Sequence, residues 1–413
     1  MGNLNLVRSL YSATAGLLLV GLMAGSVLSA QVQTKTDSSG VIRLLHIGKA
    51  WLRAGYPASM WIKDPRINWY PVPSHAWSMG EEAFRQLRLY LPRTIDILSQ
   101  NFDVIVEDGM DASHLRPEFH EWVPVVVKED GLGFLMADDS SSFATSGRHT
   151  SWYLYPIGDI LPVTDIAQIL REQHGYRVVP TPGNEDHPLM RNVPWNEVKI
   201  WAHNRPEPKP GSIVLAEMSR EIQWNVDKPV FVYWDLDNGR SIAYVHKWAS
   251  TPDFYRWKWG IDVLSHVIYF AARVEIPEDL ELVHQLRTLF NNFHFKKSYL
   301  ISTMDFADKF GANLADIDFN LMEITENKKE ADRQYIVQDL VESRQTMDSI
   351  IADLDLLTLR VLEAKDRALF WIFMIEWLAV TGTSMFAGFM VWTLMVRRRL
   401  YREVKVTRMV ETG

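Results

Sequence analysis

The longest apolar run of this chain covers residues 369–396 and ends at three consecutive arginines, Arg397, Arg398 and Arg399. Its twelve Leu, Ile, Phe and Val residues favour membrane insertion by about 4 to 7 kcal/mol, whereas the single acidic residue, Glu376, costs about 3 kcal/mol. A helix over this run is about 42 Å long, which exceeds the roughly 30 Å hydrocarbon core of a bilayer. We therefore predict one transmembrane helix at 369–396.

Charges at the two ends of the chain predict how this helix is oriented. The tail, residues 397–413, holds six basic and two acidic residues, and basic segments beside membrane helices stay in the cytoplasm. At the other end, Arg8 precedes an apolar stretch, which predicts a cleaved signal peptide over 1–30. Leu28 stands where a small residue is preferred, so an uncleaved signal anchor is the alternative. Either outcome places most of the chain outside the cytoplasm, attached to the cell membrane by a single C-terminal pass.

The composition excludes several classes of protein. The net charge of the whole chain is −8, and because the tail is basic, the part before the tail is more acidic still. An acidic surface does not displace the counterions of a nucleic acid, so we expect no nucleic-acid partner. The chain has no cysteine, and therefore no disulfide, no thiolate ligand for a metal and no cysteine nucleophile.

Strand-like and helical segments alternate in residues 40–276, whereas 278–368 contains no proline and a single glycine. Short apolar runs that end in polar loops occur at 41–47, 102–106 and 131–137. Such alternation is typical of a doubly wound, mostly parallel sheet, in which ligands bind beyond the carboxyl ends of the strands. We therefore predict an α/β domain over 40–276, followed by an all-α helical or coiled-coil stalk over 278–368.

The stalk has apolar residues at helical spacing. The clearest series is a heptad seam that continues into the membrane segment and consists of Met347, Ile350, Leu354, Leu357, Val361, Ala364, Ala368 and Trp371. Two arrangements bury such a seam: helices that fold back on one another, near Gly311 or near Asn327, or a coiled coil between two copies. Ser384 and Gly388 have the small-xxx-small spacing that lets two membrane helices approach closely, which favours a homodimer.

Short motifs of the α/β domain follow one another in a characteristic order. They are LLHIGKAW at 44–51, FDVIVEDG at 102–109, Trp122, GLGFLM at 131–136, Ser142-Phe143, YPIGDILP at 155–162, DHPL at 186–189, NGRSIAYV at 238–245 and a Trp-rich helix at 255–272. In this order the chain, over about residues 40–273, resembles the membrane-associated glutamine amidotransferase-like family, which is related to class I amidotransferases and trehalose-utilisation-type proteins. The resemblance implies a flavodoxin-like, class I amidotransferase-like sheet.

A class I glutaminase, which is similar in fold, needs a cysteine thiolate at the tight turn after its central strand. The corresponding turn in this chain is formed by Ala137, Asp138 and Asp139. Because the chain has no cysteine, glutamine hydrolysis through a thioester is excluded. The resemblance therefore implies an amidotransferase-like domain without its catalytic nucleophile.

The remaining catalytic candidates lie at or near predicted strand ends: Asp138, Asp139, Glu107 and His46. Carboxylates at such places act as acid, base or cation ligand. The alternative is that Asp138 and Asp139 cap a helix or form a solvated turn, and that His46 is a core residue. The chain has no His-Glu-x-x-His pattern and no glycine-rich nucleotide loop, so we predict no metal and no cofactor.

Aromatic residues give a second set of candidates. Trp51, Trp61 and Trp69 fall in a Pro-rich insertion after the first predicted strand, near the expected binding region. With Ser140, they are candidates for a groove that binds a glycan or an envelope protein, unless the indoles only fix the insertion to the sheet. Two functions follow: a non-catalytic ligand- or protein-binding or scaffolding protein of the cell envelope, or an exported hydrolase that acts on a glycan or amide through strand-end carboxylates.

Overall fold

The computed structural model divides the chain into two compact units, Met1–Leu280 and Glu281–Gly413, which we call the head and the helical unit. At residues 82–83, 169–175, 200–204 and 402–410 only the backbone is described. The described residues are 36, 39–52, 55–74, 81–137, 152–164, 169–204, 206–219, 229–245, 248 and 256–410.

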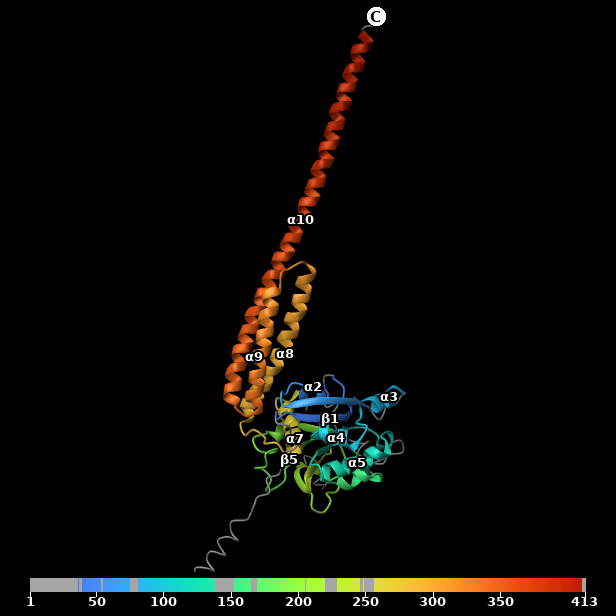
Figure 1. Ribbon diagram of the computed structural model, residues 1–413, viewed down its shortest axis with the longest axis vertical. Helices are drawn as coiled ribbons and strands as arrows, with labels where there is room; N and C mark the ends of the chain where they lie inside the picture. The colour runs from blue at the N-terminus through green and yellow to red at the C-terminus, as the bar shows by residue number, and fades with distance from the viewer. Residues whose placement is uncertain are drawn as a thin grey trace, which may run out of the picture. The chain divides into compact units, whose positions relative to one another are not determined.

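In its described residues the head contains one nine-stranded sheet, and helices lie on both sides of this sheet (Figure 1). The strands are β1 (Ile42–Gly48), β2 (Ile67–Pro73), β3 (Val104–Asp108), β4 (Gly133–Ala137), β5 (Ile169–Pro180), β6 (Lys199–Asn204), β7 (Ile213–Met218), β8 (Pro229–Leu236) and β9 (Gly239–Tyr244). The helices are α2 (Ala58–Trp61), α3 (Glu81–Tyr90), α4 (Ile95–Asn101), α5 (Pro117–Lys128) and α7 (Gly260–Ala271). Short 3-10 helices cover Ala112–His114, Trp152–Leu154, Pro156–Ile160 and Trp195–Glu197.

The sheet is mixed, with the strand order β2-β1-β3-β4-β9-β8-β7-β5-β6. Strands β2, β1, β3, β4 and β9 are parallel to one another, whereas the pairs from β9 to β6 are antiparallel. The antiparallel half begins at the hairpin between β8 and β9, which turns at Asp237 and Asn238, and a two-residue hairpin joins only antiparallel strands. The prediction of a mostly parallel sheet therefore holds for one half only, and the flavodoxin-like topology is not confirmed.

Three of the strands lie where the sequence predicts them. The runs at 41–47, 102–106 and 131–137 correspond to β1, β3 and β4, each shifted by one or two residues. Ile42 and Leu44 of β1 belong to the hydrophobic cluster on one face of the sheet, and Leu45 and Ile47 belong to the cluster on the other face. Strand β1 thus has apolar residues buried on both faces, as expected for the parallel part of a sheet.

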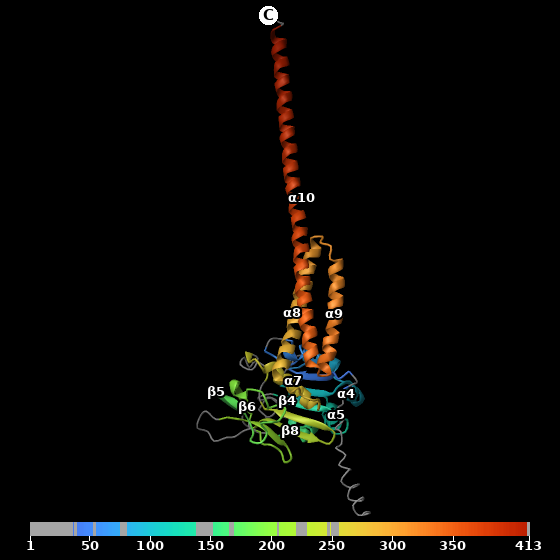
Figure 2. The same ribbon diagram turned by 90° about the vertical axis from the view of Figure 1, so that its left-hand side faces the viewer.

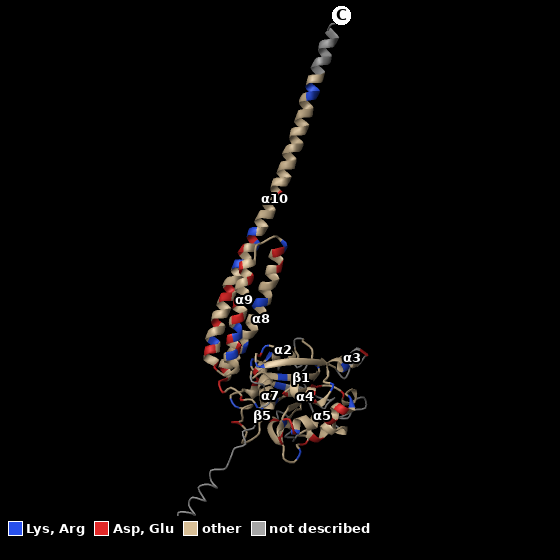
Figure 3. Ribbon diagram, viewed as in Figure 1, with Lys and Arg blue, Asp and Glu red and all other residues tan. Residues whose placement is uncertain are grey.

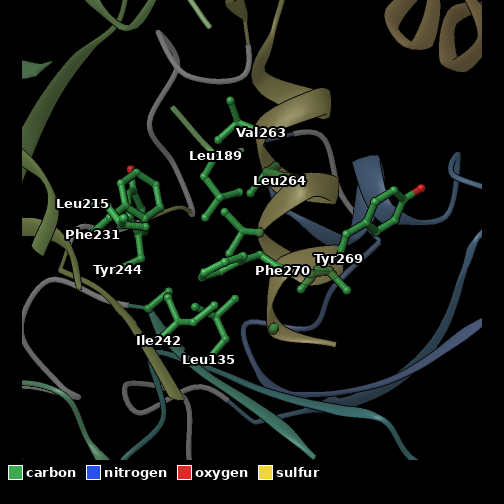
Figure 4. Packing of buried hydrophobic residues seen from close by; sticks show 14 of the residues in the cluster. Leu135, Leu189, Leu215, Phe231, Ile242, Tyr244, Val263, Leu264, Tyr269 and Phe270 are labelled. Atoms are coloured by element: carbon green, nitrogen blue, oxygen red, sulfur yellow. The ribbon is translucent and has the colours of Figure 1, made fainter. Parts of the chain in front are cut away.

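Helix α7 supplies much of the core on one face of the sheet. Figure 4 shows Leu264 and Phe270 of α7 in one cluster with Leu135 of β4 and Ile242 of β9. The same cluster contains Trp61 of α2, whose Nε1 donates a hydrogen bond to the Leu264 carbonyl at 3.1 Å. Helix α2 and strand β2 both belong to the Pro-rich insertion, which is therefore a folded part of the head.

The helical unit contains α8 (Leu280–Lys309), α9 (Ala315–Ile336) and α10 (Leu340–Val410). Figure 2 shows α8, α9 and the first part of α10 side by side, with α10 continuing beyond them. The reversal between α8 and α9 contains Gly311, whose φ of +77° favours glycine. The second reversal lies at Gln338, with φ of +66°, so the reversal predicted near Asn327 is wrong, because Asn327 is an interior residue of α9.

The heptad seam of α10 is buried within this three-helix arrangement. Met347, Leu354 and Val361 have no exposed surface, and they share a hydrophobic cluster with Phe290 of α8 and Tyr335 of α9. Packing within one chain therefore accounts for the apolar seam as far as Val361. A coiled coil between two copies stays a prediction.

Beyond the bundle, α10 changes its chemical character. Figure 3 shows the charged residues that are frequent in α8, α9 and the first part of α10, and an extended stretch of α10 where they are rare. Large apolar side chains are exposed along this stretch, among them Phe373, Leu378 and Phe389. By length and composition, α10 is the one helix in the described part of the chain that can cross a membrane.

Candidate functional site

The candidate site lies where the direction of chain crossing in the sheet reverses. From β1 the chain passes to β2 on one side, and the following strand, β3, lies on the other side of β1. Ligands of open α/β sheets bind at such a switch point, outside the carboxyl ends of the strands. The last residues of the two strands, Gly48 and Asp108, are direct partners in the register of the sheet.

Three polar side chains meet at this place, and we call His46, Lys49 and Asp108 the switch-point cluster. The Nε2 atom of His46 lies 3.8 Å from Oδ2 of Asp108, and Nζ of Lys49 lies 4.0 Å from Oδ1. His46 and Asp108 have no exposed surface, and Lys49 is 4% exposed. An ionised carboxylate in such surroundings needs opposite charge or hydrogen-bond donors close by, because burial without them is very costly.

Gly48 allows β1 and β3 to approach closely at the site. Its φ is +108°, and a Cβ built on it would lie 2.2 Å from the carbonyl oxygen of Asp108. No side chain fits in this space, so glycine is required here. The next residue, Lys49, donates its backbone N–H to that same carbonyl at 2.8 Å, which fixes the lysine beside the Asp108 carboxylate.

Trp69 of β2 determines where the ring proton of His46 lies. Its indole Nε1 donates a hydrogen bond to Nδ1 of His46 at 3.2 Å. An imidazole nitrogen that accepts a hydrogen bond carries no proton, so the proton of the His46 ring is on Nε2. The ring therefore presents an N–H donor toward Asp108, although 3.8 Å is too long for a direct hydrogen bond.

Aromatic rings surround His46 on this face of the sheet. The centroid of the Trp61 ring is 5.0 Å from that of His46, nearly perpendicular to it, and the Trp69 ring is 6.4 Å away. Trp248 lies against Trp61 and stacks on Tyr244. Of these four aromatic side chains, Trp69 is half-buried, whereas Trp61, Trp248 and Tyr244 are fully buried.

The remaining predicted site residues have different surroundings. Glu107 is buried on the opposite face of the sheet from Asp108, and its Oε1 accepts a hydrogen bond from the Met110 N–H at 2.6 Å. Trp51 is half-buried and contacts the ring of Tyr56 edge-on at 5.7 Å.

The other predicted positions cannot be compared with the cluster. Asp138, Asp139 and Ser140 lie outside the described residues. Ser384 and Gly388 are exposed positions of α10 in the helical unit.

Sequence reasoning missed Asp108 and Lys49. Both residues fall in motifs that carry the resemblance, FDVIVEDG at 102–109 and LLHIGKAW at 44–51, but neither was named as a candidate. The available signal was position: each residue stands at the carboxyl end of a predicted buried strand, and the ends of neighbouring parallel strands meet at one edge. No group of three or more His, Asp or Glu side chains in the described part of the chain is placed to hold a metal ion.

His187, in the DHPL motif, is a half-buried histidine of the head. Its Nδ1 accepts the Leu189 N–H at 3.2 Å, and its ring lies edge-on to Phe270 at 4.9 Å. Burial, and then the positive charges of Arg240 and Arg191, lower the pKa of His187 from 6.5 to about 4. His187 is therefore a neutral structural residue near pH 7.

A polar cluster also occurs inside the helical unit. Asp332 and Lys328 of α9 are joined by an ion pair of 2.7 Å, and His294 of α8 lies beside them. Burial raises the pKa of Asp332, and Lys328 partly opposes this shift. Lys328 also lies over the ring of Phe290, so the cluster is integrated into the packing of α8 and α9.

Comparison with known proteins leaves the family of this chain open. No family model matches it, and a search of curated proteins finds no match. Similar solved structures include Cytoplasmic Protein STM1381 from Salmonella typhimurium LT2, with 18% identity over 56% of this chain and 99% of that chain and a TM-score of 0.46. Cytoplasmic Protein STM3548 from Salmonella typhimurium has 17% identity over 55% of this chain and 98% of that chain, with a TM-score of 0.44. A β-galactosidase from Bacillus circulans sp. alkalophilus has 12% identity over 57% of this chain and 32% of that chain, with a TM-score of 0.36.

Proposed function

We propose that this chain is a membrane-anchored protein of the cell envelope, whose amidotransferase-like head binds a ligand or a protein partner outside the cytoplasm without catalysing a reaction. The observation that carries the proposal is the apolar stretch of α10 at 369–396, where large side chains such as Phe373 and Leu378 are exposed. In water this surface would be strongly unfavourable, whereas in a bilayer it is solvated. The basic residues that follow favour a cytoplasmic tail.

The chemistry of the described head supports binding over catalysis. Hydrolysis by a pair of carboxylates needs the two carboxyl groups to flank one scissile bond, about 5 to 10 Å apart, whereas Glu107 and Asp108 point to opposite faces of the sheet. The chain also lacks the cysteine that a glutaminase needs. His46 and Asp108 therefore offer one hydrogen-bond donor and one acceptor carboxylate, which suit recognition of a ligand.

Ser384 and Gly388 support a further part of the proposal, namely that two copies associate through the membrane segment. Small residues four apart allow close approach of two helices.

Replacing Gly388 with Leu should lower energy transfer between two differently labelled copies in lipid vesicles. Gly382→Leu is the matched control, because Gly382 lies on another side of the helix; equal loss in both variants would contradict this interface.

Controlled proteolysis of intact cells tests the anchoring and orientation. With one epitope after residue 40 and another at the C-terminus, external protease should remove the first epitope and leave the second intact. A head that stays protected in intact cells, but is cut after lysis, would overturn the proposed function. A periplasmic marker protein serves as the control for access where the cell has an outer membrane.

A further inference from the structure

We infer that the switch-point cluster is a binding site for a neutral small molecule that carries several hydroxyl groups, such as a sugar or a polyol. This inference deepens the proposed function, because it names the ligand class of the head. It rests on the unsatisfied hydrogen-bonding atoms of His46 and Asp108, on the charges at the cluster, and on the aromatic rings beside it.

The first step concerns hydrogen bonds. The two carboxylate oxygens of Asp108 and the Nε2 atom of His46 have no hydrogen bond to any described residue. Both side chains are nevertheless fully buried. Two donors near the carboxylate, His46 Nε2 and Lys49 Nζ, lie 3.8 and 4.0 Å away. A hydrogen bond of these types needs roughly 2.7 to 3.2 Å, so the cluster holds polar groups ready for a further partner.

The second step concerns the type of partner. Asp108 disfavours an anionic group at the cluster, and Lys49 disfavours a cationic one. The partner must donate to the carboxylate and accept from the N–H on Nε2 of His46, whose position is set by Trp69. A hydroxyl group does both, and a molecule with neighbouring hydroxyl groups reaches both oxygens of Asp108.

The third step concerns the surroundings. The Trp61 ring lies 5.0 Å from the His46 ring. The Trp69 indole comes from β2, the strand beside β1, and lies 6.4 Å from the same ring. Indole surfaces pack well against the C–H faces of a sugar ring, whose edges are polar. Trp69 stands on the edge strand β2 and is half-buried, so part of the indole beside His46 is exposed to solvent.

Thermal unfolding of the full chain in mild detergent tests the inference. The probes are D-glucose, D-galactose, N-acetylglucosamine and myo-inositol, with acetamide and sodium acetate as a neutral amide and an anion. At least one hydroxylated probe should raise the unfolding temperature of the unaltered chain along a saturating curve, as expected for a ligand that binds the folded state. General stabilisation by sugars through exclusion from the surface does not saturate.

Two variants separate this site from other effects. Asp108→Asn should abolish the saturable rise, whereas Asp103→Asn, the same change at the opposite end of β3 where the carboxylate pairs with Arg43, should keep it. Trp69→Phe keeps an aromatic ring but removes the N–H that fixes His46, and it should raise the half-saturating concentration about tenfold. This second variant decides the matter if Asp108→Asn does not fold.

Several results would overturn the inference. They are the absence of any saturable rise with the hydroxylated probes, a rise with acetamide or acetate alone, and a rise that persists in both Asp108→Asn and Trp69→Phe. A crystal structure with a saturating probe that shows only water at Asp108 would overturn it as well. None of these outcomes affects the protease result on intact cells, so failure of this inference is distinguishable from failure of the proposed function.

Discussion

Trp61 and Trp69 follow the same strand in the sequence and have different physical roles. Trp61 has no exposed surface and satisfies its indole N–H within the core, at the Leu264 carbonyl. Trp69 is half-buried and uses its N–H on His46. Residue type alone therefore does not decide which tryptophan packs and which borders a site; the hydrogen-bond partner and the exposed surface do.

At Trp61 we expect a large loss of stability on truncation. Trp61→Ala removes a buried indole between α2 and α7 and should lower the free energy of unfolding by about 3 to 5 kcal/mol. Trp51→Ala is the matched control, and a smaller loss is expected there because Trp51 is only half-buried. Urea unfolding followed by circular dichroism measures both changes. Equal losses would show that the insertion is fixed to the head at Trp51 as firmly as at Trp61.

His187 predicts a dependence of stability on pH. The pKa of its imidazole is about 4 in the folded head and 6.5 in the unfolded chain, so the unfolded state binds more protons between these values. Its contribution to stability is complete above pH 6.5 and is lost as the pH falls toward 4. The unfolding temperature should therefore fall over this window more steeply in the unaltered chain than in His187→Asn, whose side-chain oxygen can still accept the Leu189 N–H. Parallel curves for the two proteins would contradict this assignment.

At the scale of elements, α10 has an inner and an outer face within the helical unit. Leu354 is fully buried against the other helices, and Leu356, two residues on, is 51% exposed. The difference follows from helical geometry, because residues two apart point about 200° apart around the axis. The two leucines therefore report on two different surfaces of the same helix.

This difference gives a test of the bundle. Leu354→Ala should lower the stability of the helical unit by about 2 to 5 kcal/mol, whereas Leu356→Ala should change it by less than about 0.5 kcal/mol. Thermal unfolding followed by circular dichroism is the measurement. If Leu356→Ala were the more costly change, a second chain would have to cover the outer face of α10.

The sequence predicts strands better than it predicts their direction. The apolar runs of β1, β3 and β4 are recognisable because both faces of these strands are buried. Strand β5 begins with polar residues, among them Arg171 and Glu172, so it has no such pattern. Nothing in a single strand records whether its neighbours run parallel or antiparallel, and for this reason the antiparallel half of the sheet was missed.

The candidate site was predicted in part, for a related reason. His46 lies in the cluster, as its place near the end of the first predicted strand suggests. The sequence reasoning named Glu107 and not its neighbour Asp108; side chains alternate between the two faces of a strand, and Asp108 is the one that faces His46. A strand boundary that is uncertain by a single residue is enough to exchange these two carboxylates.

At the scale of the whole molecule, the prediction concerns attachment to the membrane. A chain truncated after residue 368 lacks the apolar stretch of α10 and should be released from membranes by alkaline carbonate. A chain truncated after residue 396 lacks only the basic tail and should remain bound. Immunoblots of the pellet and the supernatant measure the difference. If the shorter chain stayed in the pellet, residues 1–30 would act as the signal anchor.

Helix α10 has no glycine or proline between residues 340 and 381, and the backbone of this part is helical throughout. The usual causes of a sharp bend are therefore missing over the junction between the bundle and the apolar stretch. A rod of this kind transmits torque: a twist applied to the bundle would reach the apolar stretch with little loss. If that stretch crosses a bilayer, as proposed, mechanical coupling across it needs no hinge, only a rotation of this helix.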